Sequence, residues 1–122
     1  MRRRLREEAP ILGEGTFGIT RRNNHPEMGC VVLKSAKLAN KMLFLREVDM
    51  LSRFRHPNVI RALDIDCSWP WSITMPDCGR PLRAYLNDQP AGCPSPAWQR
   101  TAKQLLDGLA HMHSLNIVHC DI

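Results

Sequence analysis

The stretch of sequence that decides the fold runs from residue 12 to residue 34 and contains three closely spaced glycines. It begins Leu12-Gly13-Glu14-Gly15-Thr16-Phe17-Gly18-Ile19-Thr20 and ends Val31-Val32-Leu33-Lys34. Asn, Pro and Gly residues between positions 23 and 29 predict a turn, and the residues on either side of it predict strands. We therefore expect strand, glycine turn, strand, turn and strand in that order. Such a hairpin can fold over a nucleotide, because glycine has no Cβ to keep backbone N–H groups away from phosphate oxygens.

Two readings of this stretch compete with a phosphate-binding turn. The G-x-G-x-x-G spacing also opens dinucleotide-binding folds, but in those folds a helix follows the last glycine at once. Here Gly18 is followed by Ile19-Thr20-Arg21-Arg22, which does not predict a helix. The second reading is an ordinary hairpin relieved by glycines, with Lys34 as an exposed lysine. In the nucleotide reading, Lys34 is a fixed positive charge beside the phosphates.

Composition favours one small, reduced, globular domain. The chain has 122 residues, of which 43% are apolar, and this is enough for a core. Its five cysteines form no C-x-x-C pair, so neither a zinc site nor a redox dithiol is expected. No apolar N-terminal segment and no run of about 18 apolar residues is present. We expect an intracellular protein, cytoplasmic or nuclear, with no membrane partner.

The first eight residues form a basic arm that contains Arg2-Arg3-Arg4-Leu5-Arg6 and contributes much of the net charge of +5. Such an arm can bind nucleic acid, and strongly salt-dependent binding to DNA would support that hypothesis. Glu7 and Glu8 follow at once, however, and no aromatic residue lies among the arginines. A solvated arm is the better interpretation, and a nucleic-acid partner is not expected.

Residues 41–54 contain good helix formers and neither Gly nor Pro, which predicts a helix of about four turns. Leu43, Glu47 and Leu51 are spaced by four and share one face. A carboxylate on an apolar stripe needs a cationic partner, because an unpaired buried charge is costly. Lys34 is the natural partner of Glu47. The alternative is a glutamate that reaches solvent at the edge of the stripe.

The rest of the chain predicts short elements and one long helix. Residues 56–60 should end the first helix and start a new strand, residues 72–75 should form a strand, and residues 81–86 a short helix. A long helix is predicted over residues 96–113, with Ser95 as its N-cap. Its apolar face, which has little in this chain to cover it, consists of Trp98, Ala102, Leu105, Leu106, Leu109 and Met112.

Five motifs, in order along residues 12–122, resemble those of the eukaryotic-type protein kinases. Gly13, Gly15, Phe17, Gly18 and Lys34 resemble the glycine-rich loop and the strand lysine of that family. The other four motifs are the helix glutamate at Glu47, the segment His56-Pro57-Asn58, a hinge at Met75-Pro76-Asp77-Cys78-Gly79, and the start of a catalytic loop at His119-Cys120-Asp121.

The resemblance implies ATP as cofactor and assigns roles to individual residues. Asp121 would accept the proton of a substrate hydroxyl, Lys34 would hold the phosphates, and Glu47 would hold Lys34. The nucleotide-binding residues that it implies are Leu12, Gly13, Glu14, Gly15, Thr16, Phe17, Gly18, Thr20, Val32, Lys34, Met75, Asp77 and Cys78. Mg²⁺ would also be required, but its ligands would lie beyond residue 122, so no metal-binding residue is assigned.

The resemblance also implies an α+β fold, with an antiparallel sheet and one helix forming a small lobe that is followed by the first helices of a large lobe. The expected organisation is the basic arm at residues 1–8 and a partial kinase domain at residues 9–122. Within that domain, residues 9–79 would form the small lobe and hinge, and residues 80–122 the beginning of the large lobe. The chain would then be a fragment cut at its catalytic aspartate, and inactive by itself.

The leading hypothesis for function is a protein kinase that transfers the γ-phosphoryl group of ATP to serine or threonine hydroxyls of a protein substrate. The alternative is a catalytically silent kinase-like module that binds a nucleotide or a partner. The two hypotheses differ in whether transfer accompanies binding.

Overall fold

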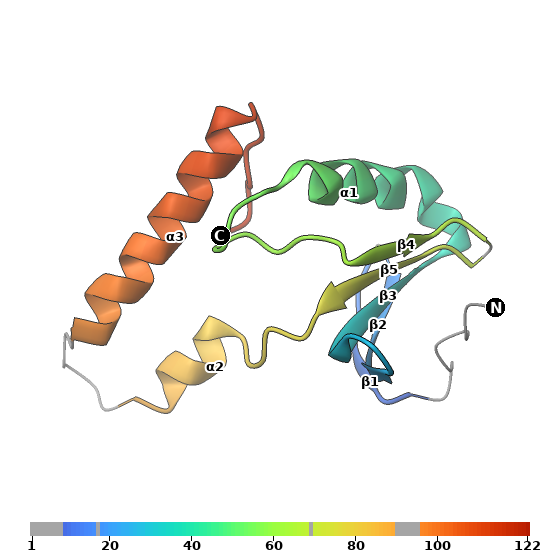
Figure 1. Ribbon diagram of the computed structural model, residues 1–122, viewed down its shortest axis with the longest axis horizontal. Helices are drawn as coiled ribbons and strands as arrows, with labels where there is room; N and C mark the ends of the chain where they lie inside the picture. Colours follow the sequence, from blue (N-terminus) through green and yellow to red (C-terminus); the bar gives the residue numbers. More distant parts are fainter. Residues whose placement is uncertain (1–8, 17, 69, 90–95) are drawn as a thin grey trace. The chain divides into compact units, whose positions relative to one another are not determined.

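The structure is a computed structural model that describes residues 9–16, 18–68, 70–89 and 96–122 (Figure 1). The basic arm at residues 1–8, Phe17 and the N-cap Ser95 lie outside this part of the chain. The described residues form two compact units. The first contains the residues up to Arg55 and residues 60–77, and the second contains residues 56–59 and 78–122.

The first unit is built on a five-stranded antiparallel sheet with the strand order β1-β2-β3-β5-β4. Its strands are β1 (Ile11–Glu14), β2 (Gly18–His25), β3 (Gly29–Ala36), β4 (Asp64–Asp66) and β5 (Ser72–Pro76). The second turn ends at Gly29, whose φ of 72° lies in the left-handed region that glycine adopts without strain. The predicted order of strand, glycine turn, strand, turn and strand is confirmed, and so is the α+β class.

One helix packs on this sheet. The short η1 (Leu38–Asn40) leads into α1 (Lys41–Arg53), which runs along the sheet in Figure 1. Phe44 and Leu51 are buried on its inner face, and the Phe44 ring lies 6.4 Å from the Trp71 ring, centroid to centroid. Leu43 is exposed instead, so the buried stripe of α1 is rotated toward Phe44 relative to the prediction. Burial of the Phe44 side chain contributes about 1.5–3 kcal/mol.

The second unit contains α2 (Leu82–Asn87) and α3 (Pro96–Ser114), together with the turn at residues 56–59. This turn packs on α3 at Gly108, where an added Cβ would lie 3.0 Å from the Asn58 carbonyl oxygen. The rings of His56 and His111 stack beside this contact, with centroids 5.3 Å apart. The absence of a side chain at Gly108 therefore allows the turn to approach the helix backbone closely.

The strand that follows α1 begins later in the chain than predicted. The strand expected to begin within residues 56–60 begins at Asp64 instead. In place of a strand, the Val59 N–H donates to the His56 carbonyl at 3.2 Å and closes a turn. Residues 117–118 likewise pair with no strand of the described chain, and the Ile117 N–H donates to the Met112 carbonyl at 3.0 Å. In both segments, local hydrogen bonds replace pairing with a neighbouring strand.

The apolar face predicted for α3 is largely open to solvent. Trp98, Leu105 and Leu106 on this face are exposed.

Within the described residues, no helix combines the length and the hydropathy that a membrane crossing would require.

Candidate functional site

The glycine turn between β1 and β2 is closed by a backbone hydrogen bond of 3.0 Å from the Gly15 N–H to the Gly18 carbonyl. Its glycines have different surroundings. A Cβ on Gly18 would lie 2.3 Å from the Ser35 carbonyl oxygen of β3, whereas a Cβ on Gly13 or Gly15 would meet no atom within 4 Å. Gly18 is therefore required by the sheet itself. Gly13 and Gly15 leave space that no part of the described chain fills.

Four of the predicted nucleotide-binding residues lie on one face of the sheet. In the register of the central strands, Thr20 of β2 is opposite Lys34 of β3, and Met75 of β5 is opposite Val32 of β3. Val32 and Lys34 are two residues apart, so both project from the same face, and cross-strand partners project from that face as well. Leu12 falls in the irregular part of β1, where the register shifts between Ile11 and Gly13.

Lys34 and Glu47 form an ion pair across the space between β3 and α1. The Lys34 Nζ lies 2.7 Å from each carboxylate oxygen of Glu47. The two side chains are only 18% and 25% exposed, so the pair is partly shielded from water. This contact was expected from the glutamate on the apolar stripe of the helix, and the structure contains it. The catalytic roles of the two residues stay predictions.

Two further contacts join the glycine turn to the segment that follows β3. The Lys37 Nζ lies 2.6 Å from Oε1 of Glu14. The hydrogen bond from Lys37, together with its positive charge, lowers the pKa of the Glu14 carboxyl. In addition, the Asn40 side-chain amide donates to the Thr16 carbonyl oxygen at 2.5 Å. The turn is thus tied by both a charged and a neutral contact.

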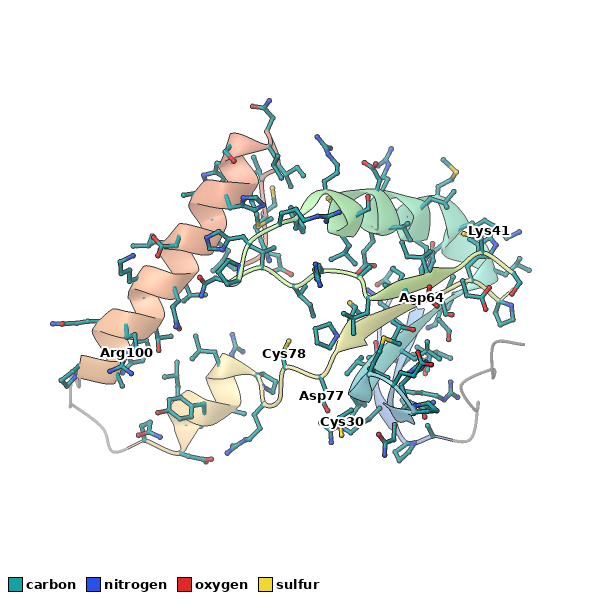
Figure 2. All side chains as sticks on the ribbon, in the orientation of Figure 1. Cys30, Lys41, Asp64, Asp77, Cys78 and Arg100 are labelled. Carbon is teal, nitrogen blue, oxygen red and sulfur yellow. The ribbon has the colours of Figure 1, made fainter. Side chains whose placement is uncertain are left out.

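The end of β5 is tied to the neighbouring strands at Asp77. The Arg22 Nε of β2 lies 2.6 Å from Oδ2 of Asp77. The Asp77 N–H donates to the Cys30 carbonyl of β3 over a longer distance of 3.4 Å, and Figure 2 shows Cys30 and Asp77 side by side. The first hinge residue predicted to bind the purine is therefore held against the sheet by its side chain and its N–H. Cys78, the second, is exposed and belongs to the other unit.

The predicted catalytic Asp121 lies in the second unit, after α3. Its N–H donates to Nδ1 of His119 at 3.1 Å, and Cys120 between them has a φ of 66°. A non-glycine residue in the left-handed region marks a tight local turn. Asp121 is exposed at this turn. Its assignment as the catalytic base stays a prediction.

Sequence reasoning missed three residues that hold the site in place: Arg22, Lys37 and Asn40. All three contact residues that were predicted to bind the nucleotide, namely Asp77, Glu14 and Thr16. No periodicity signals such contacts, because the partners are distant in sequence. The sequence carries a weak signal for Asn40, since Asn is favoured at helix N-caps. In the structure, the Asn40 side chain makes no capping hydrogen bond and contacts Thr16 instead.

Comparison with known proteins gives consistent matches. A family model described as "Protein kinase domain" matches residues 6–122. The chain is 30% identical over 119 residues to "Cell division control protein 2 homolog 3" of Trypanosoma brucei brucei, covering 92% of this chain and 38% of that protein. It is also 30% identical over 135 residues to "Cyclin-dependent kinase 4" of Mus musculus, covering 95% of this chain and 45% of that protein. The chain thus spans about two fifths of the length of these curated relatives.

Proposed function

Because this chain belongs to the protein kinase domain family, we propose that it binds ATP through its glycine turn and Lys34. We further propose that the full protein carrying this chain transfers the γ-phosphoryl group to serine or threonine hydroxyls of a protein substrate. The observation that supports the proposal best is the Lys34–Glu47 ion pair, with Nζ 2.7 Å from both carboxylate oxygens. Glu47 fixes the ammonium group at the sheet face that carries Thr20 and Val32.

The chemistry that we assign to the chain's own residues is binding and proton transfer. Backbone N–H groups of the glycine turn would contact phosphate oxygens, and Lys34 would neutralise part of their charge. Asp121 would accept the proton of the attacking hydroxyl. The sheet face with Val32 and Met75 would contact the base. Positioning and charge stabilisation supply most of the catalysis in phosphoryl transfer, so these roles fit the reaction.

Mg²⁺ accompanies ATP in this family, but we assign none of these residues to it. Among the described residues, no group of three or more His, Cys, Asp or Glu side chains could hold a metal ion.

The test separates binding from transfer. We expect calorimetry to show that the chain binds ATP, and radiolabelled ATP to show that the full protein labels serine and threonine peptides rather than tyrosine peptides. The Asp121→Asn variant is the control for contaminating kinase, and it should bind ATP but incorporate little label. Labelling by this variant at the wild-type rate would contradict the assignment of Asp121. ATP binding without any transfer by the full protein would favour the silent module.

A second candidate function concerns an activating partner. One relative is named a cyclin-dependent kinase, and exposed apolar side chains gather on η1 and the first turns of α1 at Leu38, Met42 and Leu45. We propose that a cyclin binds this surface and thereby holds α1, and with it Glu47, in place. Burial of apolar side chains of this size would provide the driving force.

For the cyclin surface we expect the double variant Leu38→Asp/Met42→Asp to weaken binding to a responsive member of a cyclin panel at least about tenfold, because it places two charges in an apolar contact. Leu106→Asp is the matched control, since Leu106 is equally exposed but lies on α3. The affinities can be compared by surface plasmon resonance. An equal loss in the Leu106 variant, or no loss in the double variant, would refute this surface.

A further inference from the structure

The glycine turn carries a carboxylate at the place where we propose that phosphates bind. Glu14 is the last residue of β1 and adjoins Gly13 and Gly15, the two glycines that leave open space. A lone carboxylate there would repel a polyphosphate. A glutamate carboxyl is ionised at neutral pH, and Lys37 lowers the pKa of Glu14 further. Its charge is offset by the Lys37 ammonium, 2.6 Å away.

Asn40 also contacts the glycine turn, through a hydrogen bond to the Thr16 carbonyl. It stands immediately before α1, where an Asn side chain normally accepts a hydrogen bond from the first turn of the helix. Here the side chain makes no such bond and instead donates to the Thr16 carbonyl at 2.5 Å. The cap is thus given up for a contact with the turn, 24 residues earlier in the chain.

Both contacts come from one short connection. Lys37 directly precedes η1 and Asn40 is the last residue of η1, which connects β3 to α1, and those two elements also carry the Lys34–Glu47 pair. We infer that Lys37 and Asn40 are positioning residues for a polyphosphate ligand, in which Lys37 cancels the charge of Glu14 and Asn40 fixes the carbonyl of Thr16. This inference rests on the proposed nucleotide binding and adds to it a device that discriminates ligands by their phosphate charge.

If Lys37 neutralises Glu14, the loss of affinity caused by removing Lys37 should depend on the number of phosphates in the ligand. Without Lys37, the uncompensated Glu14 carboxylate repels a ligand in proportion to the negative charge that the ligand carries. At exposed positions such an interaction is screened, so we expect Lys37→Met to weaken ATP binding about three- to tenfold and ADP binding less. Adenosine, which has no phosphate, should bind with unchanged affinity. The loss for ATP should also shrink as the salt concentration rises.

The decisive measurement is a set of calorimetric affinities for adenosine, ADP and ATP, each at low and high salt. The double variant Lys37→Met/Glu14→Gln should recover most of the ATP affinity, because it removes the carboxylate that Lys37 neutralises. Lys103→Met is the matched control: it also removes one lysine from an exposed pair, with Asp107 2.6 Å away on α3. It should leave the dependence on phosphate number unchanged. If Lys37→Met weakens adenosine as much as ATP, or if the double variant binds ATP as poorly as Lys37→Met, the charge role is wrong.

Asn40 is tested by a substitution that separates capping from contact with the turn. Asn40→Ser retains a good N-cap residue, but its shorter hydroxyl does not span the distance to the Thr16 carbonyl. We expect Asn40→Ser and Asn40→Ala to weaken ATP binding to a similar extent, by about threefold or more, with adenosine unaffected. Wild-type ATP affinity in the Ser variant would show that the contact between Asn40 and Thr16 has no role in ATP binding.

The same titrations distinguish this inference from the function on which it rests. A wild-type chain that binds none of the three ligands overturns the nucleotide proposal and this inference with it. A wild-type chain that binds all three, but in which Lys37→Met shows no dependence on phosphate number, overturns this inference alone.

Discussion

Replacing Lys34 by Met is expected to lower phosphoryl transfer by the full protein about 100- to 1,000-fold, a loss typical of removing one preorganised charge from an active site. The ion pair gives the reason: Glu47 holds the ammonium in a single place, with both oxygens 2.7 Å away. Methionine keeps the length and the apolar stem of lysine, so the sheet is preserved. Steady-state kinetics with radiolabelled ATP measure the effect, and transfer near the wild-type rate would mean that Lys34 has no role.

The same substitution leaves Glu47 without its partner, which complicates the interpretation of a loss. An unsatisfied charged group that is partly shielded costs about 1–3 kcal/mol, and this would appear as a lower melting temperature. The double variant Lys34→Met/Glu47→Gln removes the orphaned charge. We expect it to melt close to the wild type and still to transfer no more phosphate than the single variant. Recovery of transfer together with stability would show that Lys34 matters only for folding.

Replacing Gly18 by Ala is expected to reduce the free energy of unfolding by about 2–4 kcal/mol, at or above the upper end for overpacking a buried position. The added Cβ would lie 2.3 Å from the Ser35 carbonyl oxygen. That oxygen belongs to the backbone of β3 and cannot move aside as a side-chain tip would, so β2 and β3 must separate. Urea denaturation followed by circular dichroism gives the difference. An unchanged midpoint would show that the two strands are not packed as closely as described.

Gly15→Ala is the matched control for Gly18, because an added Cβ there meets no atom within 4 Å and Gly15 has no positive φ. The fold therefore does not require glycine at this position. We expect the Gly15 variant to unfold within about 1 kcal/mol of the wild type while its affinity for ATP falls. A loss of stability equal to that of Gly18→Ala would remove the distinction between the two glycines.

The sequence was sufficient for the parts of the fold that depend on local pattern. The residues around the glycine turn predicted β1, β2 and β3. The helix-forming residues at positions 41–54 predicted α1 to within one residue of its end. The Lys34–Glu47 contact was also predictable, because a carboxylate on the same helix face as Leu51 needs a partner. In each case the pattern that supports the prediction lies within a short segment of the sequence, a few helical turns or a single strand in length.

The parts that failed depend on partners far away in the chain. Where β4 begins is decided by its pairing with β5, in which Asp64 lies opposite Thr74, and residues 59–60 have no such partner. The contacts of Arg22, Lys37 and Asn40 likewise involve polar side chains whose neighbours are set by the completed sheet. Nothing in the amino-acid pattern distinguishes Arg22 and Lys37 from other polar residues, and Asn40 has only the weak signal of an N-cap residue.

The position of β1 in the sheet has a consequence for how the turn behaves. β1 is an edge strand of four residues that pairs with β2 alone, contains a register shift, and is exposed along its whole length. Segments with few buried contacts open locally at a small fraction of the global unfolding free energy. The amides of β1 should therefore exchange with solvent faster than those of β3. The glycine turn that follows β1 should accordingly interconvert between closed and open forms. The apparent affinity of a ligand that binds only the closed form equals its intrinsic affinity multiplied by the fraction of molecules that are closed. Opening of this edge strand therefore lowers the apparent affinity of the turn for its ligand.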